Sequence, residues 1–149
     1  MQIRHKNREI YFREQTECTQ KYVIPYIEQV LCIKSNLRVL EIGCGEGGNL
    51  KPFLDVGCHC VGIDIDVAQL EKAKAFFANH SLNKNLRLIA NDIYKVSPNE
   101  IGNFDLIILR DVIEHLPNQE LFMHQLKCFM HSESVVFFGF PVWCNPFGG

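Results

Sequence analysis

The sequence predicts an α/β fold, in which helices cover both faces of a doubly wound, mainly parallel sheet. Two observations support this fold class. Short apolar runs alternate along the chain with segments whose apolar residues recur at helical spacing. The runs are apolar at nearly every position, which is typical of parallel strands that are buried on both faces. Short right-handed crossovers would then wind the helices around the sheet.

The expected elements follow one another without a linker or an internal repeat, so residues 1–149 are expected to form one domain. Residues 1–15 are polar and are expected to be a mobile arm or a short helix ahead of a core at 16–149. Helical spacing predicts an amphipathic helix over 16–31, which either begins near Pro25 or is kinked there. The expected strands are 37–42, 59–63, 86–90, 104–109 and 135–140, and the later helices are 49–56, 67–80 and 118–130. Pro52 fits the first turn of the helix at 49–56, and Gly57 fits its C-terminal stop.

Composition argues against several classes of partner. The net charge of −2 gives no sign of a basic patch, so neither a nucleic acid nor an anionic membrane is expected as a partner. The longest apolar run, 135–143, is too short and too broken to span a bilayer. Seven cysteines behind a polar N-terminus without a secretory signal indicate reduced thiols in the cytoplasm. Cys58, His59 and Cys60, with Cys44, lack the spacing of a metal site, and no metal is expected.

A glycine-rich turn, Gly-Cys-Gly-Glu-Gly-Gly at 43–48, separates the first strand from the next helix. In this arrangement main-chain N–H groups at a helix N-terminus cradle a nucleotide-like ligand. Glycine is needed there because the turn requires φ > 0 and a close approach of the backbone to the ligand. Gly43-x-Gly45-x-Gly47 fits one spacing and Gly43-x-Gly45-x-x-Gly48 fits the dinucleotide fingerprint equally well, so the turn alone does not identify the ligand.

Two acidic residues end the strands that follow. Asp64 ends the second strand and can accept hydrogen bonds from both hydroxyls of a ribose; the alternative is a cap of the next helix, for which Asp66 is better placed. Asp92 ends the third strand and can accept from an adenine amino group, with Ile65 and Ile93 as apolar covers of the ring. The alternative for Asp92 is an Asx-turn.

Glu41 lies inside the first apolar strand, two residues before the first glycine. A carboxylate at that depth needs a partner, either a main-chain N–H or a cationic group of the ligand.

Together these motifs resemble the class I S-adenosylmethionine-dependent methyltransferases. The segment 39–47 matches the first motif of that family, 61–64 its second-strand acid, 91–93 its adenine-contacting acid, and 104–117 its fourth strand and the following loop. The resemblance runs from about residue 20 to residue 140 and implies a Rossmann-like methyltransferase fold with S-adenosyl-L-methionine as cofactor. It implies that the glycine turn holds the aminocarboxypropyl end of the cofactor and that main chain at Leu109 and Arg110 contacts its amino group. The implied cofactor-binding residues are Glu41, Gly43, Cys44, Gly45, Gly47, Asp64, Ile65, Asn91, Asp92, Ile93, Leu109 and Arg110.

The candidate catalytic residues are His115 and Glu114, in the segment that follows the fourth strand. His115 could accept a proton from a hydroxyl group of the acceptor. Asp111, Glu114 and His115 could instead form part of a divalent metal site, as similar acid-x-x-Glu-His segments do in some quinone-biosynthesis O-methyltransferases and small-RNA methyltransferases, although that pattern usually begins with Glu. A third interpretation is that Glu114 and His115 only order the loop over the cofactor. Trp143 and Tyr11 could line a substrate pocket or merely plug the end of the sheet.

The resemblance is incomplete at the C-terminal end. Class I methyltransferases usually have seven strands, whereas this chain ends nine residues after the fifth expected strand. We therefore expect a C-terminally truncated domain that lacks strands six and seven. The fifth strand would then be an apolar edge strand through which the chain could form a homodimer.

The sequence thus predicts an S-adenosylmethionine-dependent methyltransferase that acts on a small molecule. One alternative is an NAD(P)-dependent oxidoreductase, a function in which Asp92 and the Glu-His-Leu-Pro segment would have no role. Another is a non-catalytic module that binds S-adenosylmethionine.

Overall fold

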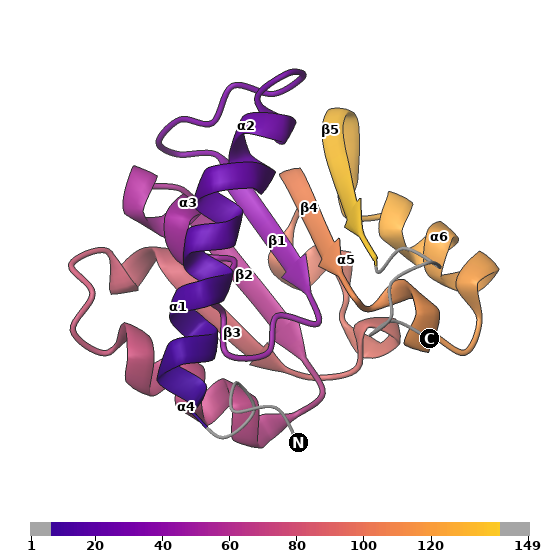
Figure 1. Cartoon of the computed structure of the whole chain (residues 1–149). Coiled ribbons are helices and arrows are strands. Elements are labelled where there is room, and N and C mark those ends of the chain that lie inside the picture. The colour runs from indigo at the N-terminus through magenta and orange to yellow at the C-terminus, as the bar shows by residue number, and fades with distance from the viewer. Residues whose placement is uncertain (1–6, 141–149) are drawn as a thin grey trace.

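The computed structural model describes residues 7–140, and in this part of the chain five strands form one sheet in the order β3-β2-β1-β4-β5 (Figure 1). All four pairs of neighbours are parallel, which confirms the predicted α/β fold class. The strands are β1 (Arg38–Ile42), β2 (His59–Asp64), β3 (Leu86–Ala90), β4 (Phe104–Arg110) and β5 (Met130–Gly139). The chain adds β2 and β3 on one side of β1 and then crosses to β4 on the other side, so the strand order reverses between β1 and β4. Open α/β sheets bind their ligands outside the carboxyl ends of the strands at such a point.

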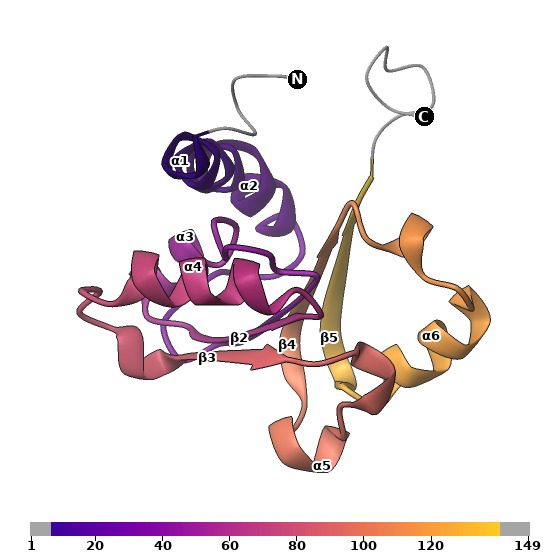
Figure 2. The same ribbon diagram turned by 90° about the horizontal axis from the view of Figure 1, so that it is seen from below.

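Helices cover both faces of the sheet. Figure 2 shows α1 (Arg8–Cys18), α2 (Ile24–Ile27), α3 (Lys51–Val56) and α4 (Val67–Phe77) on one face, and α5 (Pro98–Ile101) and α6 (Gln119–Lys127) on the other. Side chains of β1 alternate between the two faces: Val39 belongs to the apolar cluster under α1–α4, and Leu40 and Ile42 belong to the cluster under α5 and α6. Glu41 therefore shares the face of Val39 and points toward the layer that contains α1 and α3.

The N-terminal segment is more helical than the sequence suggested. From Arg8 onward the structure has the short helix rather than the mobile arm, and residues 1–6 of the predicted arm lie outside the described residues. It continues through one π-helical turn, η2 (Thr19–Val23), in which the N–H of Ile24 donates to the carbonyl of Thr19. A widened turn makes room for Pro25, which lacks an N–H group and would otherwise clash with the preceding turn. The predicted helix over 16–31 is thus three elements that end at Ile27.

Most other boundaries agree with the sequence-based prediction. Pro52 is in the first turn of α3, and Gly57 ends that helix in the left-handed conformation with φ of 98°, as expected. Three helices are shorter than predicted: α3 begins at Lys51 rather than at position 49, α4 ends at Phe77, and α6 spans Gln119–Lys127, with Asn118 as its N-cap.

β5 begins five residues earlier than predicted, because Met130 pairs with Phe104 before a register shift. The hydroxyl of Ser134 accepts from the N–H of His131 and donates to the carbonyl of Phe104, and these two bonds hold the polar residues 131–134 in the strand. β5 is an edge strand of the described sheet, and none of its residues is fully buried. Within residues 7–140 no helix combines the length and the apolar character needed to cross a bilayer. The six cysteines of that range are free thiols.

Candidate functional site

A cavity of about 980 Å³ opens at the carboxyl ends of the strands, beside the reversal of strand order. The glycine turn, the ends of β2, β3 and β4, and the segment at 110–117 line it. Side chains of α1 and η2 form its remaining wall, and Figure 1 shows α1 running across this side of the sheet. The edge of the sheet at which the sequence predicted a ligand therefore has a concave site of ligand size.

The glycine turn has the backbone conformation that the sequence predicted. Gly43, Gly45 and Gly47 have φ of 70°, 52° and 79°. A Cβ atom at Gly43 would also overlap Cγ2 of Val112, which packs over the turn from the segment after β4. Gly48 has another requirement, because a Cβ atom there would lie 2.8 Å from the carbonyl oxygen of Phe12 in α1. Glycine at these positions thus permits both the left-handed turn and the close approach of α1.

Asp64 connects the glycine turn to the end of β2. One oxygen, Oδ2, accepts a hydrogen bond of 2.7 Å from the N–H of Gly45, and Oδ1 accepts one of 2.8 Å from the N–H of Asp66. Asp66, as expected, caps α4 by accepting from the main chain of Ala68 and Gln69. Asp64 lines the cavity, and each of its oxygens has a further lone pair that can accept from a ligand hydroxyl.

Asp92 forms the Asx-turn that was its alternative interpretation, and it also lines the cavity. Its Oδ1 accepts from the N–H of Tyr94 at 3.0 Å and caps the short helix that begins at Ile93. Asn91, Ile65 and Ile93 line the same part of the wall. Ile65 is 76% exposed whereas Ile93 is 5% exposed, so the structure brings both side chains to the cavity at different depths.

Glu41 lies behind the cavity wall. It is 1% exposed, its Oε1 accepts a hydrogen bond of 2.7 Å from Nδ2 of Asn49, and its Oε2 has no partner among residues 7–140. Burial raises the pKa of Glu41 to about 8. The expected partner was a main-chain N–H or a ligand cation, and the observed one is the amide of Asn49, which lines the cavity itself. Asn49 was not among the predicted site residues, although its place as a polar residue directly after the glycines was a signal for it.

The other residues of the implied cofactor set differ in position. Cys44 and Gly45 lie in the cavity wall, whereas Gly47 and Leu109 do not. Burial raises the pKa of the Cys44 thiol far above its usual range, which disfavours the reactive thiolate form. Arg110 lines the cavity with its side chain, whereas the resemblance concerned its main chain.

The segment after β4 turns sharply at Asp111, which has a left-handed φ of 54° and donates its N–H to the carbonyl of Gly139 in β5. The turn brings Asp111 and His115 into the cavity wall, while Glu114 is exposed and outside that wall. Across residues 7–140 there is no group of three His, Cys, Asp or Glu side chains with the arrangement of metal ligands. Asp111, Glu114 and His115 are thus not grouped together in the described part of the chain, where only Asp111 and His115 share the cavity wall.

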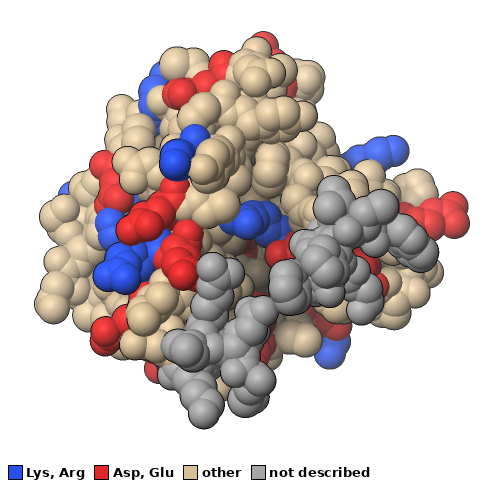
Figure 3. Space-filling view, in the orientation of Figure 1, with Lys and Arg blue, Asp and Glu red and all other residues tan. Residues whose placement is uncertain are grey.

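The wall formed by α1 and η2 contains several residues that sequence analysis missed, because the segment was interpreted as a packing helix. Arg8 forms an ion pair of 2.6 Å with the buried Glu46 of the glycine turn. Thr16 donates to the carbonyl of Gly48, and Tyr11 lines the cavity as one interpretation proposed. Trp143, its suggested companion, lies outside the described residues. Figure 3 shows acidic and basic side chains interspersed on this face of the molecule.

Comparison with known proteins identifies relatives along most of the chain. A family model described as a methyltransferase domain matches residues 12–141. The ubiquinone biosynthesis O-methyltransferases of Bartonella tribocorum and Brucella melitensis are each 26% identical over 125 residues, which cover 76% of this chain and 49% of each relative. The chain therefore spans about half the length of the curated relatives it matches.

Solved structures show the same fold. A coclaurine N-methyltransferase bound to N-methylheliamine and SAH has a TM-score of 0.69 at 20% identity, over 82% of this chain and 35% of that chain. PKMT2 from Rickettsia typhi, in complex with AdoHcy, has a TM-score of 0.68 at 23% identity, over 79% of this chain and 24% of that chain. At these identities the likeness concerns the fold alone.

Proposed function

Because the chain belongs to the methyltransferase domain family, we propose that it binds S-adenosylmethionine in the cavity and takes part in methyl transfer to a small molecule. The observation that carries this proposal is the cavity itself, in which a left-handed glycine turn and the carboxylates of Asp64 and Asp92 meet at one edge of the sheet. The structures of a coclaurine N-methyltransferase with SAH and of PKMT2 with AdoHcy support this choice of ligand.

The chemistry of the wall fits such a ligand. Asp64 offers lone pairs to ribose hydroxyls while its main-chain bonds hold it against the turn. Asp92 has one oxygen, Oδ2, without a hydrogen bond from residues 7–140, and Ile65 and Ile93 offer apolar surface beside it. Near the glycine turn, Asn49 connects the cavity to Oε1 of Glu41, and Oε2 of the same carboxyl group has no partner among residues 7–140. A cationic ligand group bound near Glu41 would lower the pKa of that carboxyl group and restore its charge.

The cofactor would supply a methyl group on a positively charged sulfur. The residues of the chain would mainly hold and align the two reactants, and alignment alone can lower a barrier by roughly 7–11 kcal/mol. His115 lines the cavity and is exposed, so its imidazole is available to accept a proton from a hydroxyl acceptor. Glu114 is outside the wall, and we propose that it orders the loop rather than contacts a reactant.

We further propose that the acceptor is a small molecule, which the names of the ubiquinone biosynthesis O-methyltransferases support, and that the chain acts in the reducing cytoplasm. The apolar edge strand β5 supports a homodimer. Sedimentation velocity over a range of concentrations tests the dimer, and a monomer at all concentrations would contradict it.

Calorimetric titration with S-adenosylhomocysteine and, separately, with NAD tests the choice of ligand. We expect S-adenosylhomocysteine to bind with a micromolar dissociation constant and NAD not to bind. The opposite result would favour the dinucleotide-dependent oxidoreductase. Release of S-adenosylhomocysteine in the presence of phenols, amines and carboxylic acids would then identify the acceptor, and its absence with every acceptor class would favour a non-catalytic binding module.

A further inference from the structure

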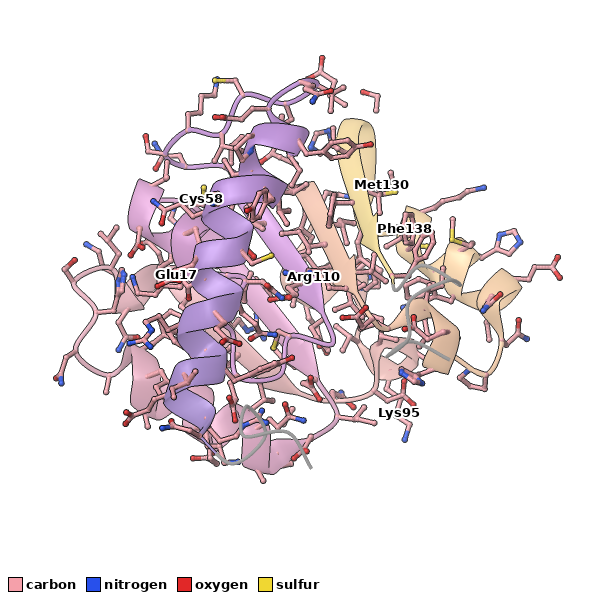
Figure 4. All side chains as sticks on the ribbon, in the orientation of Figure 1. Glu17, Cys58, Lys95, Arg110, Met130 and Phe138 are labelled. Atoms are coloured by element: carbon pink, nitrogen blue, oxygen red, sulfur yellow. The ribbon has the colours of Figure 1, made fainter. Side chains whose placement is uncertain are left out.

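Arg110, the last residue of β4, presents a guanidinium group to the cavity without a carboxylate partner in residues 7–140. Its Nη1 donates a hydrogen bond of 2.9 Å to Oδ1 of Asn49, and Nη2 lies 4.0 Å from the sulfur of Cys18 in α1. The side chain is half-buried and lines the cavity, and Figure 4 shows Arg110 beside α1. Of the five guanidinium N–H donors, one points to Asn49 and one toward the weakly accepting sulfur of Cys18. The others are available to a ligand.

Neighbouring residues hold this guanidinium in one orientation. Asn49, its acceptor, is itself fixed, because Oδ1 also accepts from Oγ1 of Thr19 at 2.9 Å and Nδ2 donates to Glu41. The stem of Arg110 passes over Gly139 of β5, where a Cβ atom would lie only 3.1 Å from Cγ of Arg110. The side chain is therefore oriented by two strands and by the η2 segment before any ligand binds. Such preorganisation lowers the entropic cost of binding.

Arg110 has no ion pair with a carboxylate of the described part of the wall, and its side-chain partners there are Asn49 and Cys18. The buried carboxyl group nearest to this network is Glu41, and burial raises its pKa to about 8, so it is largely protonated at neutral pH. The other cations of the cavity differ from Arg110: Arg8 is paired with Glu46, and Lys21 lies over the ring of Tyr22 at 5.1 Å. A half-buried cation without a counter-ion is unfavourable, and a ligand anion would remove that penalty.

We propose that Arg110 is the carboxylate-binding residue of the cavity and forms two parallel hydrogen bonds with a carboxylate group of a bound ligand. A guanidinium group matches a carboxylate in planarity and in the spacing of its donors. The inference rests on the proposed function, because the ligands of that function supply two sources of the carboxylate. One is the amino-acid tail of the cofactor, and the other is an acidic methyl acceptor.

Isothermal titration of the wild-type chain and of Arg110→Gln with three probes tests the proposal. The probes are S-adenosylhomocysteine, its decarboxylated analogue, and benzoate, which is titrated both into the free protein and into the protein saturated with S-adenosylhomocysteine. If the carboxylate belongs to the cofactor, Arg110→Gln binds S-adenosylhomocysteine about 10- to 100-fold more weakly and binds the decarboxylated analogue as the wild type does. If it belongs to the acceptor, affinity for S-adenosylhomocysteine is unchanged and the variant loses benzoate binding.

Two matched variants make the result specific. Arg13→Gln removes a charge from the exposed face of α1 and should bind every probe as the wild type does. Arg110→Lys keeps the positive charge but lacks the two parallel N–H donors of a guanidinium group, so we expect an intermediate loss of affinity. This variant also replaces Arg110→Gln if the latter does not fold. The proposal would be overturned if Arg110→Gln bound both S-adenosylhomocysteine and benzoate as the wild type does. It would also be overturned if the variant lost as much affinity for the decarboxylated analogue as for S-adenosylhomocysteine. A wild-type chain that does not bind S-adenosylhomocysteine would refute the proposed function instead, while benzoate would still test Arg110.

Discussion

Asn49 donates a hydrogen bond of 2.7 Å from its amide nitrogen to Oε1 of Glu41, a carboxyl group that is buried in β1. Glu41 lies in the strand before the glycine turn, and Asn49 is the first residue after the turn. Their contact closes the turn from behind, while Asp64 fastens it from the side of β2 through Gly45. The conformation of the glycine turn thus depends mostly on the side chains of Glu41, Asn49 and Asp64, and not on the glycines alone.

We expect Glu41 to make stability depend on pH. An acid whose pKa is higher in the folded chain, here about 8 against 4.5, stabilises the fold fully below about pH 4.5, and this contribution is lost as the pH rises toward 8. Between about pH 5.5 and 7.5 the free energy of unfolding of the wild type should fall by about 2–3 kcal/mol more than that of Glu41→Gln, which cannot ionise. Urea denaturation at both pH values measures this difference. The same pH dependence in the two proteins would contradict the assignment.

Gly43→Ala should affect both stability and ligand binding. The substitution forces an L-residue to φ of 70° and pushes its Cβ atom into Val112, which together should cost about 2–4 kcal/mol of unfolding free energy. Gly57→Ala is the matched control, because it also has a left-handed φ but lies at the end of α3, outside the cavity wall. It should cost only about 1 kcal/mol. Calorimetry should detect weaker binding of S-adenosylhomocysteine to the first variant and unchanged binding to the second.

Asp64→Ala should weaken binding of S-adenosylhomocysteine by about 10- to 100-fold, since it removes a charged acceptor from the cavity and releases the N–H of Gly45. Asp66→Ala removes a carboxylate two residues away that is outside the cavity wall, caps α4 and accepts from the side chain of Gln69. This control should lower the midpoint of thermal unfolding slightly and leave affinity as it is. Equal affinities of the wild type and Asp64→Ala would refute the ribose assignment.

The parts of this structure that the sequence predicted correctly are those with a local signal. The apolar runs define the five strands, Pro52 and Gly57 mark the ends of α3, and Asp66 marks the start of α4, because each feature depends on neighbouring residues alone. The left-handed turn at Gly43 follows from composition in the same way.

The parts that were missed depend on contacts between distant segments. Asn49 is the partner of Glu41 because Thr19 of η2 and Arg110 of β4 fix the orientation of its amide. The spacing of apolar residues along the sequence gives no sign of such contacts. The role of α1 as a wall of the cavity arises from Arg8 and Thr16, whose partners lie more than 30 residues away in the glycine turn. Likewise, β5 begins at Met130 because of its pairing with Phe104, although its own residues there are polar.

Arg8→Ala should loosen the contact of α1 with the glycine turn. Glu46 has a fully buried side chain, and among residues 7–140 it would keep only Lys72, at 3.7 Å, as a cationic partner, so we expect the free energy of unfolding to fall by about 1–3 kcal/mol. Arg13→Ala breaks an exposed pair with Glu17 at 3.9 Å and should cost less than about 0.5 kcal/mol. Hydrogen exchange of the amides of α1 should become faster in the first variant alone. Unchanged protection there would show that α1 is held mainly by its apolar contacts.

His115 and Glu114 provide the sharpest test of the catalytic proposal, since adjacent residues have different relations to the cavity. With a hydroxyl acceptor, His115→Gln should lower kcat by about 10²- to 10⁴-fold and leave the affinity for S-adenosylhomocysteine unchanged. Glu114→Gln should have little effect on kcat, because its side chain is exposed and outside the cavity wall. If both variants keep the wild-type kcat, the segment only orders the loop, and the acceptor reacts without a base from these residues.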